Sequence, residues 1–122
     1  MLRAFGGGDD GDGVGSGSAH IFVRSGSSWS QQAKLTASDA ARRDYFGSSV
    51  SISGDYALAG SPYDDDIIYP LYPDGNEKGS AYVFLRSGTT WSQQAKLTAY
   101  DDYYIYANFG WSVSISGDYA LV

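Results

Sequence analysis

Hydrophobic and polar residues alternate with a period of two along several short segments of the chain. In the first of them Phe46, Ser48, Val50 and Ile52 fall on one face, and the other face consists of Gly47, Ser49, Ser51 and Ser53. Such alternation is typical of a β-strand that is buried on one side. Gly54-Asp55 follows as a predicted two-residue hairpin turn, since glycine in the first central position suits a type II′ turn.

Three further strands complete this unit, and the pattern predicts them over 56–60, 81–86 and 91–99. In the last of these, alternation places Trp91 on the same face as Ala95, with the polar residues on the opposite face. Leu97 is expected on the face of Trp91 as well. The first strand has a copy later in the chain, whose inward face is expected to consist of Phe109, Trp111, Val113 and Ile115.

A tandem repeat of about sixty residues organises these strands. The segment 17–26 recurs with small changes at 79–88, and the segment 29–36 recurs letter for letter at 91–98. Four antiparallel strands in each repeat are the signature of a β-propeller blade. A β-sandwich is the structural alternative, but near-identical tandem copies favour radial repetition. The predicted fold class is therefore all-β, built from antiparallel four-stranded propeller blades.

The repeat divides the chain into parts of three blades. Residues 1–16 are expected to be an acidic, glycine-rich loop from a preceding blade, and residues 17–38 the last two strands of a first blade. Residues 46–99 form a complete blade, and residues 109–122 form the first two strands of a third. Incomplete blades expose sheet edges. We therefore expect either a fragment of a longer exported protein or a chain whose partial blades are completed head to tail by other copies of itself.

Two short boxes carry a resemblance to a known family. Phe46-Gly47 and Gly60-Ser61-Pro62 resemble the Phe-Gly and Gly-Ala-Pro boxes of the FG-GAP repeat, which occurs in integrin α-subunit heads and microbial surface proteins. The segment 79–84 resembles the strand that follows in this family, and Phe109-Gly110 opens a second copy. The resemblance spans roughly residues 17–122. It implies a β-propeller, a location outside the cell or on its surface, and a role in adhesion or ligand binding.

Acidic residues suggest a calcium site, although not where integrin-like members of this family have theirs. Those members bind calcium between the first two strands of a blade, and here that connection is only the short hairpin at Gly54-Asp55. Aspartates cluster in other connections, where they can supply the hard oxygen ligands that calcium prefers. Solvated turns are the alternative. The candidate calcium ligands are Asp9, Asp10, Asp12, Asp64, Asp65, Asp66 and Asp74.

The connections are also rich in tyrosine. Tyrosine supplies rigid, amphipathic contact area to a protein or glycan ligand, and the alternative is that these rings pack on one another over the ends of the blades. Connections from second to third strands and from fourth to first strands project from the same end of a propeller. The candidate ligand-binding residues are Tyr63, Tyr69, Tyr72, Tyr100, Tyr103, Tyr104 and Tyr106.

The composition of the chain argues against several classes of function. The chain has 14 acidic and 8 basic residues, and its net charge of −6 argues against nucleic acid as a partner. It has no cysteine and a single histidine, His20, which is expected to be an ordinary strand residue. We expect no catalytic residues and no enzyme activity. No stretch is long and apolar enough for a membrane span, and an export signal is expected to lie outside this chain.

The expected function is a non-catalytic extracellular or surface module that binds a protein or glycan. One alternative is a structural protein that assembles with other copies of itself into rings or filaments. Another is an accessory domain of a larger secreted enzyme.

Overall fold

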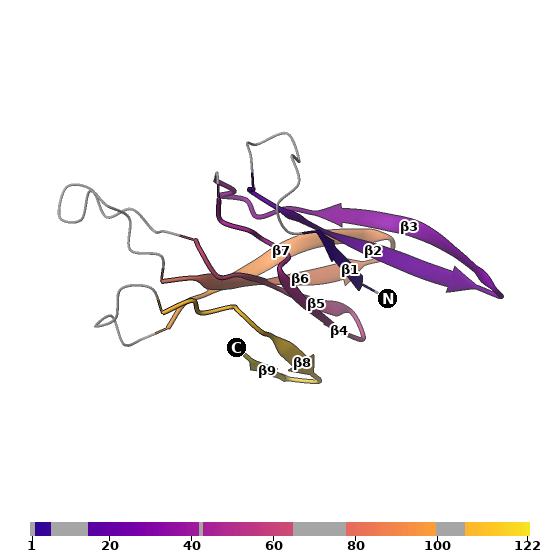
Figure 1. Cartoon of the computed structure of the whole chain (residues 1–122). Coiled ribbons are helices and arrows are strands. Elements are labelled where there is room, and N and C mark those ends of the chain that lie inside the picture. Colours follow the sequence, from indigo (N-terminus) through magenta and orange to yellow (C-terminus); the bar gives the residue numbers. More distant parts are fainter. Residues whose placement is uncertain (1, 6–14, 42, 65–77, 100–106) are drawn as a thin grey trace.

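The computed structural model of the chain describes residues 2–5, 15–41, 43–64, 78–99 and 107–122. Within these ranges the regular structure consists of antiparallel β-strands in three sheets, which confirms the all-β class. The four-stranded sheet lies between the other two (Figure 1). The strands are β1 Leu2–Phe5, β2 Ser18–Ser25, β3 Ser28–Leu35, β4 Ser49–Ser53, β5 Tyr56–Ser61, β6 Ser80–Ser87, β7 Thr90–Leu97, β8 Ser114–Ser116 and β9 Tyr119–Leu121.

The central sheet has the strand order β4-β5-β6-β7 and confirms the predicted four-stranded blade. Its first hairpin pairs Ser53 with Tyr56 across Gly54-Asp55. The backbone φ angle is positive at Gly54 and not at Asp55, as a type II′ turn requires. The hairpin predicted from the sequence is therefore present.

The first sheet has one more strand than the sequence analysis expected. Leu2–Phe5 was included in a loop over 1–16, but it forms β1 and pairs with β2. Leu2 stands opposite Ile21 as Leu58 stands opposite Val83 in the central sheet, so β1 corresponds to β5. A strand of four residues is too short for its alternation to be recognised, and its pairing with a distant segment decides its conformation.

A β-bulge overturns the predicted faces of the fourth strand. The register between β6 and β7 shifts at Gln94, which is an extra residue without a partner on β6. Trp91 therefore lies on the face opposite to Ala95 and Leu97, and Lys96 moves to the face of Trp91. The prediction that Trp91, Ala95 and Leu97 share a face was wrong, because a strict period of two does not reveal an inserted residue.

Trp111 was expected to point inward, but 64% of its surface is exposed. The amide of Trp111 donates a hydrogen bond to the carbonyl of Asn108 and closes a turn, and regular strand structure begins only at Ser114. Alternation therefore does not extend back to Trp111. Ser48, at the same position of the complete blade, is exposed as well.

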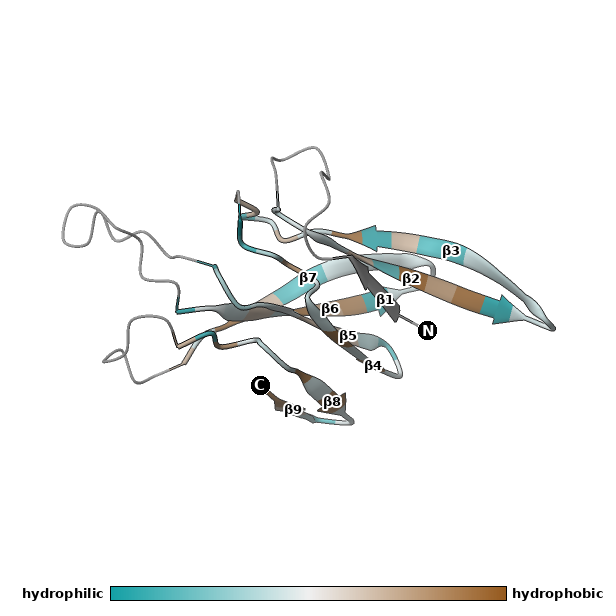
Figure 2. Cartoon of the chain, in the orientation of Figure 1, coloured by the Kyte–Doolittle hydropathy of each residue, from teal (hydrophilic) through white to brown (hydrophobic). Residues whose placement is uncertain are grey.

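The hydrophobic core lies between the first and central sheets. Phe46 is fully buried at its centre, with its ring edge-on to Tyr82 at 5.4 Å and to Phe84 at 5.9 Å. Such geometry is favourable for aromatic pairs. Small and aliphatic residues of both sheets surround these rings, among them Ile21 and Leu35 of the first sheet. Hydrophobic residues are visible along β2 and β6 (Figure 2).

A close backbone contact joins the two sheets beside this core. Phe46 and Gly47 are the central residues of a turn that the amide of Ser48 closes on the carbonyl of Tyr45. Gly47 has a φ of 83°, which marks the turn as type II. A Cβ atom on Gly47 would overlap with the carbonyl of Ser18 on β2. Glycine is therefore required here both by the backbone angle and by the space available.

The serines that alternate along β4 connect the central sheet to the third sheet. The hydroxyl of Ser49 donates to the carbonyl of Gly110 at 2.9 Å. The hydroxyl oxygen of Ser51 accepts from the amide of Ile115 at 3.1 Å, and that of Ser53 accepts from Gly117 at 3.2 Å. This polar face of the strand is therefore an interface between blades.

Replacing Gly47 with alanine is expected to lower the free energy of unfolding by at least about 3 kcal/mol, because it adds a backbone overlap to an unfavourable φ. The matched control is Gly54→Ala. Gly54 also has a positive φ, but it has open space around it. We expect that control to cost about 1 kcal/mol. Urea unfolding followed by circular dichroism measures both values, and equal losses would contradict a role for the close contact.

Candidate functional site

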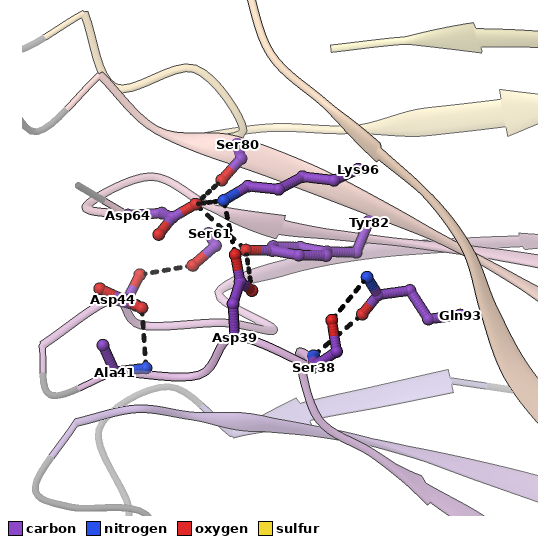
Figure 3. Close-up of polar contacts among 10 residues, drawn as sticks. All are labelled: Ser38, Asp39, Ala41, Asp44, Ser61, Asp64, Ser80, Tyr82, Gln93 and Lys96. Carbon is purple, nitrogen blue, oxygen red and sulfur yellow. Dashed lines mark hydrogen bonds and ion pairs between the residues drawn. The ribbon is translucent and has the colours of Figure 1, made fainter. Parts of the chain in front are cut away.

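A network of polar side chains lies at the end of the sheets where β5 ends and β6 begins (Figure 3). Asp64 follows β5 and is only 6% exposed. One of its carboxylate oxygens, Oδ2, accepts a hydrogen bond from the hydroxyl of Ser80 and lies 3.1 Å from the hydroxyl of Tyr82. The same oxygen lies 2.7 Å from the Nζ of Lys96. Asp64 is thus fixed by residues from both β6 and β7.

Asp39 joins the same network from the connection between β3 and β4. Its Oδ1 lies 2.7 Å from the hydroxyl of Tyr82, and its Oδ2 lies 2.7 Å from the Nζ of Lys96. Lys96 therefore bridges two carboxylates that belong to different connections. The residues Asp39, Asp64, Tyr82 and Lys96 are called the clamp below.

Two further contacts hold the connection between β3 and β4. The side-chain amide of Gln93 donates to the hydroxyl of Ser38 at 3.0 Å, and the backbone amide of Ser38 donates back to the Gln93 carbonyl oxygen at 3.0 Å. At the other end of this connection, the hydroxyl of Ser61 donates to the backbone carbonyl of Asp44 at 2.8 Å. The connection is therefore attached to both β5 and β7 of the central sheet.

The surroundings of Tyr82 and Asp39 shift the pKa values of these two groups away from neutral pH in opposite directions. Burial raises the pKa of Tyr82 far above its ordinary value, and the hydrogen bond to Asp39 and the negative charge of Asp64 raise it further. Partial burial also acts to raise the pKa of Asp39. The hydrogen bonds from Lys96 and Tyr82 outweigh this effect and hold that pKa below its ordinary value. The clamp therefore contains a neutral phenol and an ionised Asp39 beside Lys96.

The β-bulge at Gln94 makes the clamp possible. In a strand that alternates regularly and has no bulge, Lys96 would lie on the opposite face of β7 from Trp91, away from the first sheet. The bulge places Lys96 on the same face as Tyr82, and its Nζ lies 5.5 Å from the centre of that ring. Bulges commonly redirect side chains in this way. Sequence reasoning assigned Lys96 to a polar outer face and so missed the clamp.

Among the predicted calcium ligands, only Asp64 belongs to the described residues. Its Oδ2 already contacts Ser80, Tyr82 and Lys96, so these contacts give Asp64 a role in holding the sheets together. Within the described ranges, His, Cys, Asp and Glu side chains do not gather into a cluster of three that could hold a metal ion. The calcium site stays a prediction. Its other candidate ligands, which lie outside the described residues, are Asp9, Asp10, Asp12, Asp65, Asp66 and Asp74.

Among the predicted ligand-binding tyrosines, Tyr63 is the one that the structure describes. Its ring is edge-on to the rings of Tyr45 at 5.3 Å and of Trp111 at 6.4 Å. Tyr45 and Trp111 were not among the predicted site residues, although both stand beside a Phe-Gly pair and so belong to the same end of the blades. The remaining predicted tyrosines lie outside the described residues: Tyr69, Tyr72, Tyr100, Tyr103, Tyr104 and Tyr106.

A family model described as the FG-GAP repeat matches residues 29–84 and 91–122, which together make up most of the chain. No curated protein sequence matches the chain. In the part of the chain that the structure describes, no helix has the length and apolarity that crossing a membrane demands.

Replacing Lys96 with methionine is expected to lower the free energy of unfolding by roughly 3 kcal/mol, because Asp64 would stay buried without its counter-ion. The control is Arg86→Met. Arg86 pairs with Asp55, but their side chains are 41% and 56% exposed, so its loss should cost less than about 1 kcal/mol. Urea unfolding at neutral pH compares the two variants. A smaller loss for Lys96→Met than for Arg86→Met would rule out a stabilising clamp.

Proposed function

The chain belongs to the FG-GAP repeat family, and from this premise we propose that it is a non-catalytic β-propeller module that binds a protein or glycan ligand. Its place of action in this proposal is the cell surface or the extracellular space. The observation that carries the proposal is the convergence of two kinds of connection at one end of the sheets, where the contacts of the clamp hold them together. Binding residues commonly reside on connections that a rigid scaffold positions.

The convergence is visible in the contacts of the described residues. Asp64 begins the connection from β5 to β6, Asp39 lies in the connection from β3 to β4, and both bind Lys96. Tyr63 and Trp111 extend the same end of the molecule toward the third sheet. Residues from neighbouring blades therefore form a composite surface there, while the tight hairpin turns lie at the opposite end (Figure 1).

The chemistry of the clamp supports binding rather than catalysis. A general base needs a pKa near the working pH, and the raised pKa of Tyr82 keeps that phenol protonated. The charges of Asp39 and Asp64 face Lys96 and are engaged with it. The net charge of −6 disfavours nucleic acid as a ligand.

An array experiment tests the proposal. Labelled chain is applied to printed neutral glycans, acidic glycans and purified secreted proteins, with and without a calcium chelator. We expect saturable binding that falls at least tenfold when Tyr69, Tyr72, Tyr103 and Tyr104 are replaced by serine. The control is Arg86→Met, which changes an exposed residue on β6 near the hairpin turn. Absence of binding to every printed probe would contradict the proposal, and binding that the four substitutions leave unchanged would exclude these four tyrosines as ligand residues. Loss of binding with chelator would support calcium in the acidic connections.

A second candidate function is self-assembly, and one observation favours it. An open cleft of about 290 Å³ lies between β8–β9 and the face of the central sheet that points away from the first sheet. Its lining includes the hydrophobic residues Val83, Leu97 and Ile115. At the edge strand β9, Tyr119 is 83% exposed and Leu121 is 76% exposed. Sheet edges and apolar faces of this kind accept strands from other chains.

The β2–β3 hairpin of a second copy resembles in sequence the β6–β7 hairpin, which completes the central sheet. In the proposed assembly it completes the third sheet by pairing with β9, which takes the place of the four-residue β1 at the edge of β2. Light scattering over a hundredfold range of concentration tests the idea. The expected result is a mass that grows with concentration and returns to that of the monomer in the variant Leu121→Asp. A constant monomer mass for the unchanged chain would exclude self-assembly.

A further inference from the structure

We infer that Tyr45, Tyr63 and Trp111 form a stacking site for the apolar face of a neutral hexopyranose sugar. This inference rests on the proposed function and narrows its ligand from protein or glycan to a neutral glycan. The three rings are called the aromatic row below.

The aromatic row is assembled from three separate segments. Tyr45 precedes the first strand of the central sheet, Tyr63 follows its second strand, and Trp111 precedes β8 of the third sheet. Tyr63 stands in the middle, with its ring 5.3 Å from that of Tyr45 and 6.4 Å from that of Trp111. Trp111 is 64% exposed, and the two tyrosines are half-buried. The three rings therefore contact one another edge to face, and the row reaches solvent at Trp111.

The exposure of Trp111 is a property of its position in the repeat. Ser48 occupies the same position in the complete blade, which has a neighbouring sheet on each side, and it is exposed there too. The fold therefore accepts a small polar residue at this point of the turn. The large exposed indole of Trp111 is therefore not required by the turn. Exposed apolar surface of this kind often marks a binding site.

The backbone conformation of Tyr45 is an independent reason to infer a ligand site at the aromatic row. Tyr45 has a φ of 54°, and its counterpart in the second copy, Asn108, has a φ of 53°. Asparagine adopts this left-handed conformation readily, whereas a bulky residue is strained in it. Arg43, two residues earlier, is also strained, with a φ of 72°. Asparagine would serve the fold better at position 45, and strain of this kind is concentrated at ligand sites.

The shape and surroundings of the row favour a sugar over a protein. The row consists of only three side chains, and its neighbours in the sequence include the exposed hydroxyl-bearing residues Ser48 and Ser112. A pyranose ring presents a face of C–H groups and a rim of hydroxyls, so it can stack on an aromatic ring and form hydrogen bonds around it. A stable protein partner would need a far wider surface, about 800 Å² on each side. The net charge of −6 favours neutral over acidic sugars.

The test uses two substitutions that introduce the residue found at the equivalent position of the other repeat copy. Trp111→Ser copies Ser48, and Tyr45→Asn copies Asn108, so neither variant introduces a residue foreign to its position. Arg86→Met is the control away from the row, because Arg86 is exposed and lies on β6 near the hairpin turn. The full chain is titrated by calorimetry with cello-, chito-, manno- and galacto-oligosaccharides, and thermal unfolding is recorded for each variant.

We expect at least one of these oligosaccharides to bind, Trp111→Ser and Tyr45→Asn each to weaken that binding at least tenfold, and Arg86→Met to leave it unchanged. The unfolding temperature of Tyr45→Asn should equal or exceed that of the unchanged chain, because the substitution relieves strain. Sugar binding that survives both substitutions would overturn the inference. If a protein on the array binds and no oligosaccharide does, the sugar site is wrong and the proposed function stands. If no probe of either kind binds, both are wrong.

Discussion

The close backbone contact between Phe46-Gly47 and the start of β2 is the constraint on which the other contacts between blades depend. At this point two backbone segments of the chain approach so closely that a Cβ atom on Gly47 or on Gly17 would overlap with the opposite segment. The second copy repeats the contact between Phe109-Gly110 and the start of β6. Because the contact consists of backbone atoms, it fixes the distance between neighbouring sheets independently of the side chains around it.

That distance determines which side chains can join the sheets. It places the ring of Phe46 against Tyr82 and Phe84 in the core, and it lets the short hydroxyl side chains along β4 reach the backbone of the third sheet. It also brings Asp39 within hydrogen-bonding reach of Lys96. The sheets are thus joined by a backbone contact, a hydrophobic core and hydrogen bonds of short polar side chains.

The two ends of the molecule differ in chemistry as a consequence. One end contains tight two-residue turns, where a glycine such as Gly54 has open space around it. The other end contains the clamp, the strained backbone at Tyr45 and the aromatic row. A rigid base beneath a strained and exposed surface is the arrangement expected of a binding site, since function commonly costs local stability. The proposed glycan site follows from this difference between the ends.

The sequence by itself determined the all-β class, the four-stranded blade, the hairpin at Gly54-Asp55 and the family, because alternation, turn chemistry and tandem repetition act over short stretches of chain. Tertiary structure decided the strand β1, the bulge at Gln94 and the exposure of Trp111, since each depends on pairing or on a turn that a period of two does not encode. The clamp is the clearest case. Asp39 and Lys96 are 57 residues apart in the chain, and only the packing of one blade on the next brings their charges together.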